Sequence, residues 1–89
     1  MIASRPFDLD EVACIARVLG VSNEVDVREL RRGMNVELEH GRRDPLTDVT
    51  GDDPLVTAKI ALAHLREMPD YYTRLSRMEV DSGGELLAG

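Results

Sequence analysis

The stretch FDLDEV, residues 7–12, decides how this chain begins to fold. Asp8 belongs to the residue types that accept hydrogen bonds from the free N–H groups at a helix start. Glu11 stands three residues later, where its carboxylate can bond back to the N–H of the cap. Phe7 precedes the cap and can pack against Val12, as in a hydrophobic staple. This capping box predicts that a helix begins here.

A second capping box occurs in VDVREL, residues 25–30, where Asp26 is the predicted cap and Glu29 its partner. Each box is followed by apolar residues at helical spacing and then by a glycine that can end a helix. The apolar stripes are Val12, Ile15, Ala16 and Leu19 before Gly20, and Val27, Leu30, Met34 and Leu38 before Gly41. Two such boxes in one short chain predict an all-α fold.

The segment GRRDPLTDVTGDD, residues 41–53, shows no periodicity and is predicted to be a long loop of about a dozen residues. A third helix is predicted to begin at Asp53, with Pro54 in its first turn, and to end before Pro69. Its residues are apolar on nearly every side, which indicates the most buried helix. A short fourth helix follows Asp70, with apolar Tyr71, Leu75 and Met78 on one side.

The length of 89 residues allows one domain with a small core. The sequence therefore predicts a single helical domain over residues 1–80, formed by a compact bundle of three main helices and a short C-terminal helix. Residues 81–89, DSGGELLAG, are glycine-rich and are predicted to form a flexible tail.

Seventeen acidic against eleven basic residues give a net charge of −6, which disfavours direct binding to a nucleic-acid backbone. An acidic surface suits a protein that docks on a partner protein. The chain has no apolar run of the roughly 20 residues that a membrane span needs. Its N-terminus lacks the layout of a signal peptide, and its single cysteine, Cys14, excludes an internal disulfide. These features predict a cytoplasmic protein without membrane attachment.

Two pairs of residues have the spacing of metal ligands on a helix: Glu37 with His40, and His64 with Glu67. In a simple antiparallel hairpin, however, Glu37 stands opposite Thr57 and about 10 Å along the axis from His64, at about 1.5 Å per residue. Both pairs could then bind one divalent transition metal only if the register of the two helices were slipped or if a second copy of the chain supplied one pair. The alternative is structural, with Glu37 accepting hydrogen bonds from Thr57 or from the loop.

The predicted partner contacts are Asp48 and Asp52 in the acidic loop, and Tyr72. The loop does not fit the ligand pattern of an EF-hand in any register, so its acids are expected to cap turns and the next helix. Tyr71 shares a side with Leu75 and is expected in the core. Tyr72 points about 100° away and is the better candidate for a surface contact, since tyrosine is common in interfaces; the alternative is simple packing against the third helix.

Three motifs, ELEHG (37–41), DVTGDD (48–53) and TAKIALAHLREMPDYY (57–72), resemble a family of small bacterial and phage-associated domains catalogued as a domain of unknown function. The resemblance covers about residues 26–79. It implies a self-contained helical module and assigns no catalytic residue or cofactor.

The first functional hypothesis is a non-enzymatic binding or accessory module that docks a protein partner or associates with itself. The second is a metal-binding protein that uses Glu37, His40, His64 and Glu67 across a dimer. A third is a phage-type acidic inhibitor that mimics nucleic acid. No catalytic residue is predicted, because the sequence shows no nucleophile elbow, phosphate-binding glycine loop or dinucleotide motif.

Overall fold

The computed structural model describes residues 6–81, and their side chains as far as Met78. Within this range the chain forms four helices and no strand, which confirms the predicted all-α fold. The helices are α1 (Leu9–Leu19), α2 (Val27–Arg43), α3 (Pro54–Glu67) and α4 (Tyr71–Asp81). The predicted tail lies outside the described residues, except for Asp81, which ends α4.

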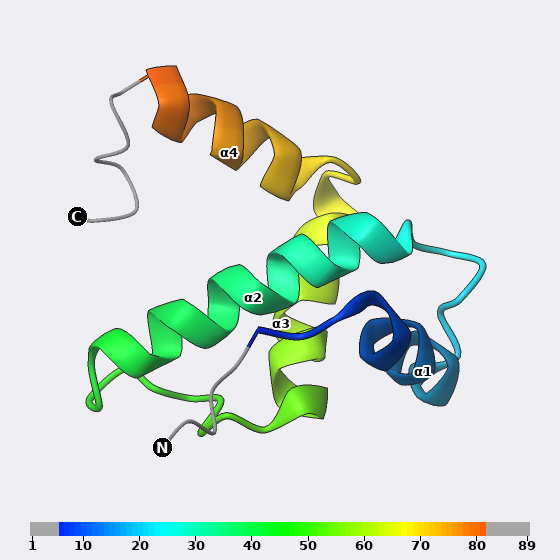
Figure 1. Ribbon diagram of the computed structural model, residues 1–89, viewed down its shortest axis with the longest axis horizontal. Coiled ribbons are helices and arrows are strands. Elements are labelled where there is room, and N and C mark those ends of the chain that lie inside the picture. Colours follow the sequence, from blue (N-terminus) through cyan, green and yellow to red (C-terminus); the bar gives the residue numbers. More distant parts are fainter. Residues whose placement is uncertain (1–5, 82–89) are drawn as a thin grey trace.

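Helix α2 is the centre of the arrangement, because it packs against each of the other three helices. In Figure 1, α3 crosses steeply behind α2, α1 lies beside the first half of α2, and α4 leads away from the end of α3. None of the described helices has the length and apolar composition needed to cross a bilayer.

Helix α1 begins and ends as its sequence predicts. The N–H of Glu11 donates to the Asp8 carboxylate at 2.9 Å, and the N–H of Asp8 donates to the Glu11 carboxylate at 3.0 Å. At the other end, Gly20 adopts a φ of 74°, a left-handed conformation that costs glycine little. The first capping box is therefore confirmed.

Helix α2 departs from its prediction at both ends. Asp26 accepts a hydrogen bond from the N–H of Arg28 at 2.8 Å, but the Glu29 side chain turns toward α4 instead of completing a capping box. At the other end, the helix continues past Gly41 to Arg43. Gly41 allows close packing instead, because a Cβ there would lie 2.8 Å from Oδ1 of Asp48.

Helix α3 starts at a cap formed by Asp53, which accepts hydrogen bonds from the N–H groups of Leu55 and Val56.

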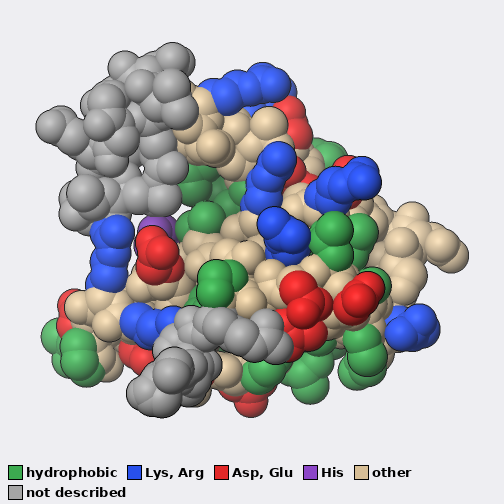
Figure 2. Space-filling model, viewed as in Figure 1, with side chains coloured by type: hydrophobic (Ala, Val, Ile, Leu, Met, Phe, Trp, Pro, Cys, Tyr) green, Lys and Arg blue, Asp and Glu red, His purple; other side chains and the backbone are tan. Residues whose placement is uncertain are grey.

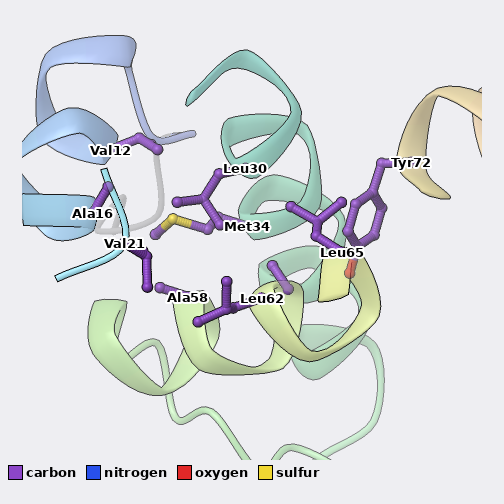
Figure 3. Close-up of a cluster of buried hydrophobic side chains, with 10 residues drawn as sticks. Val12, Ala16, Val21, Leu30, Met34, Ala58, Leu62, Leu65 and Tyr72 are labelled. Carbon is purple, nitrogen blue, oxygen red and sulfur yellow. The ribbon is translucent and has the colours of Figure 1, made fainter. Parts of the chain in front are cut away.

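The core lies where α1, α2 and α3 meet, and Tyr72 of α4 extends it (Figure 3). The core residues are Val12, Ala16, Val21, Leu30, Met34, Ala58, Ala61, Leu62, Leu65 and Tyr72. Most of these are aliphatic, as the composition predicts.

Candidate functional site

The first turn of α4 is anchored to α2 by Tyr72. Its ring lies against Gly33, where an added Cβ would come within 2.3 Å of the ring carbon Cε2. Only 2% of Tyr72 is exposed. The prediction that Tyr72 faces solvent is therefore wrong, because the missing side chain of Gly33 leaves a notch that the ring fills. Tyr71, predicted to lie in the core, is only partly buried.

The Tyr72 hydroxyl donates a hydrogen bond to Oε2 of Glu37 at 2.7 Å. Burial and then the neighbouring Glu37 carboxylate raise the pKa of the Tyr72 phenol well above its usual range, because both disfavour the phenolate. Thr57, the predicted partner of Glu37, instead donates its hydroxyl to the backbone oxygen of Asp53 at 2.7 Å. Glu37 thus joins α2 to α4, and the predicted bond to Thr57 is wrong.

His64 of α3 lies beside the same carboxylate, with 3.9 Å between its Nε2 and Oε2 of Glu37. Its ring stacks on Tyr71, with centroids 4.5 Å apart and planes 12° from parallel. The predicted separation of about 10 Å between Glu37 and His64 is wrong, because α3 crosses α2 steeply and does not run back along it (Figure 1).

The remaining predicted metal ligands, His40 and Glu67, are both exposed. Within residues 6–81, no three His, Cys, Asp or Glu side chains are grouped so that they could hold a metal ion. Only Glu37 and His64 of the predicted four are brought together by a contact of this chain. A metal site completed by a second copy stays a prediction.

A second anchor of α4 is Glu29, a residue that is only 6% exposed. Its carboxylate accepts hydrogen bonds from the N–H of Thr73 at 2.8 Å and from the Thr73 hydroxyl at 2.6 Å. Arg32 donates to the Thr73 hydroxyl at 2.7 Å and pairs with Glu29 at 3.4 Å. Glu29 therefore caps the first turn of α4 from α2, where a carboxylate also complements the helix dipole.

The acidic loop is organised by its own side chains. Asp48 accepts hydrogen bonds from the N–H of Gly51 at 2.9 Å and from the Thr50 hydroxyl at 3.2 Å. Asp52 pairs with Arg42 at 3.1 Å. These bonds are the turn-forming kind that the loop composition predicts. Contact of Asp48 and Asp52 with a partner stays a prediction.

The outer face of α4 carries an open groove of about 530 Å³. Its apolar lining is built by Tyr71, Leu75 and Met78, spaced i, i+4 and i+7, together with Met68 before the helix. Met68 and Met78 are 39% and 51% exposed, whereas Tyr71 and Leu75 are partly buried and also pack against the core, so the stripe is most open at Met68 and Met78. Arg74 and Arg77 complete the lining.

A second hollow, of about 290 Å³, lies between α2 and α4 and shares Leu75 with the groove. It is lined by Arg31, Arg32, Asn35, Val36, Tyr72, Leu75 and Ser76. Figure 2 shows basic side chains gathered over α4 and the neighbouring part of α2. The sequence did indicate the stripe on α4, but the joining of arginines from two helices depends on how those helices pack.

Comparison with models of known protein families gives a match over most of the chain. The model of a family described as "Protein of unknown function (DUF5661)" matches residues 9–81, which include all four helices. No curated protein and no solved structure matches the chain.

Proposed function

We propose that this chain, which belongs to the DUF5661 family of proteins of unknown function, is a protein-binding module whose α4 groove docks an acidic amphipathic helix of a partner protein. The observation that carries the proposal is the open apolar stripe of Tyr71, Leu75 and Met78, bordered by Arg74 and Arg77.

The shape of the stripe favours a helix as the occupant. Residues spaced i, i+4 and i+7 form a narrow apolar band along one side of α4, and such bands pack against a matching band on another helix. The start of the band is anchored, since Tyr72 and Thr73 bond to α2 and Tyr71 stacks on His64 of α3. A docked helix would therefore meet a surface that is already positioned, which lowers the entropy cost of binding.

The charge of the groove favours an acidic occupant. Among the residues whose side chains are described, its lining contains two arginines and no acidic residue, although the whole chain carries a net charge of −6. Arg74 pairs with Asp70 at 2.8 Å, while Arg77 makes no ion pair with any side chain of residues 6–78. Carboxylates beside the apolar band of a partner would complement this border and speed association.

A second copy of the chain fits the groove less well. Pairing α4 with itself would bring Arg74 and Arg77 of both copies to one interface, and like charges at an interface oppose association. Self-association through α4 would therefore contradict the proposed occupant.

The test is a titration of the isotopically labelled protein with a designed helical peptide, followed by amide NMR. The peptide is about 25 residues long, because shorter isolated helices are marginal in water, and has an alanine-rich background with one leucine stripe flanked by glutamates. The control peptide has lysines in place of the glutamates. We expect the acidic peptide to shift the amides of Met68 to Met78 and to bind at least about tenfold tighter than the control.

A matched pair of variants locates the binding surface. Leu75→Ala removes the centre of the stripe and is expected to weaken the acidic peptide about tenfold or more, as truncation of a central contact does. Val18→Ala removes a 67% exposed apolar side chain from α1 and is expected to change nothing. Equal binding of both peptides, shifts spread away from α4, or a Leu75-dependent dimer in light scattering would refute the proposal.

A further inference from the structure

We propose that the hollow between α2 and α4 binds one carboxylate of the docked helix, and that Arg31 is the residue that recognises it. This inference rests on the proposed function, because it names the acidic anchor of the same partner. The hollow shares Leu75 with the apolar groove, so the two form a continuous surface on either side of that side chain. A helix about 10–12 Å across would cover Leu75 and overhang both sides.

The polar lining residues of the hollow are Arg31, Arg32, Asn35 and Ser76. Arg32 is held in place, because it donates to the Thr73 hydroxyl at 2.7 Å and lies 3.4 Å from Glu29. Arg31 is exposed and makes no ion pair or hydrogen bond through its side chain with any residue from 6 to 78 whose contacts are described. One arginine is thus fixed, and the other is available for a new partner.

The charge of this hollow fits a single carboxylate. Arg31 and Arg32 bring two positive charges, and the buried Glu29 beside Arg32 compensates one of them. The remaining charge is matched by one negative group. A guanidinium also binds a carboxylate through two parallel N–H bonds, which fixes orientation as well as adding energy.

The apolar part of the lining favours a carboxylate carried by an amphipathic segment over a free carboxylate ion. Val36, Tyr72 and Leu75 supply apolar lining beside the arginines. A carboxylate carried on a side chain places its methylene groups on such a lining while its oxygens reach the guanidinium. The docked helix is therefore expected to carry one glutamate next to its apolar stripe, on the side that faces α2.

The test is a double-mutant cycle between the 89-residue protein and the acidic peptide. One peptide keeps all its glutamates, and a series replaces them with glutamine one position at a time. The protein variants are Arg31→Gln and, as a matched control one turn earlier on α2, Arg28→Gln, which does not line the hollow. Affinities are measured by calorimetry, and circular dichroism checks that each variant is folded.

We expect Arg31→Gln to weaken the unmodified peptide about tenfold and Arg28→Gln to weaken it by no more than about twofold. For one glutamine peptide, Arg31→Gln should cause no further loss, because the partner carboxylate is already absent. If Arg31→Gln weakens every peptide equally, or none, the inference is wrong although the groove still binds. If the unmodified peptide does not bind the unaltered protein, the proposed function itself fails.

Discussion

The ring of Tyr72 occupies the space that a side chain at position 33 would need, with 2.3 Å between Cε2 and the place of a Cβ on Gly33. Helices α2 and α4 can therefore meet only because residue 33 is glycine. The hydroxyl of the same ring donates a hydrogen bond of 2.7 Å to Glu37, which lies one turn after Gly33 on α2. This contact sets where α4 leaves the domain and which of its faces stays open.

Gly33→Ala tests the close approach. Alanine favours a helix over glycine by about 1 kcal/mol, but the added methyl must displace a buried ring, so we expect a net loss of about 2 kcal/mol of stability. Urea unfolding measures this loss. In a Tyr72→Ala background, the same substitution should stabilise the protein by up to about 1 kcal/mol, because only the helix preference remains. A loss of equal size in both backgrounds would show that the ring is not the cause.

Tyr72→Phe removes the hydroxyl that bonds to Glu37 and leaves the ring in place. We expect a loss of about 1–2 kcal/mol in urea unfolding, because the partly buried carboxylate loses its donor. Tyr71→Phe is the matched control, since the Tyr71 hydroxyl makes no hydrogen bond with any residue whose contacts are described, and it should change stability by less than about 0.5 kcal/mol. Equal effects at the two positions would contradict the assigned contact.

Glu29→Gln tests the second anchor of α4. The amide keeps one acceptor for Thr73 but loses the charge and the second acceptor, so we expect a loss of about 1–3 kcal/mol. Amide exchange should become faster at Thr73 before it does in α1. Glu39→Gln, on the exposed side of the same helix, should cost no more than about 0.5 kcal/mol, since its pair with Arg43 is 3.9 Å long and exposed. Unchanged exchange at Thr73 would rule out the capping role.

The raised pKa of Tyr72 predicts a pH dependence at the alkaline end. The unfolded phenol loses its proton near pH 10, whereas the folded phenol keeps it. The stability from this group is therefore complete below about pH 10 and falls above it, by up to about 1.4 kcal/mol per pH unit. Unfolding free energies measured across this range should show that Tyr72→Phe removes the decline in part. An identical decline in the variant would mean that another group causes it.

Much of the fold could be predicted from local sequence signals. The capping box of Asp8 and Glu11 acts over three residues, and the apolar stripes of α1 and α2 depend only on helical spacing, so neither needs knowledge of the tertiary structure. Gly41 shows the limit of such signals. It resembles a helix stop, yet the loop packs against it and the helix continues to Arg43.

The arrangement of the site residues depends on how the helices pack, which no local sequence pattern specifies. Glu29 has the spacing of a capping-box partner, but the arrival of Thr73 from α4 offers it stronger hydrogen bonds. The sequence places Gly33 inside the second helix but does not show what packs against it, so Tyr72, the candidate for a surface contact, is instead buried there. Likewise, the crossing angle of α2 and α3, which no local pattern specifies, brings His64 to Glu37.

The most direct test of docking on α4 is site-specific photo-crosslinking in the cells that make the protein. A photoreactive residue replaces Met78 in the groove or, as a control, Leu46, which is 91% exposed in the loop between α2 and α3. Crosslinked segments are identified by mass spectrometry. From position 78, and not from 46, we expect one acidic amphipathic helical segment, and Leu75→Ala should abolish its capture. Capture of a second copy of this chain, of a basic segment, or of the same segments from both positions would contradict the account.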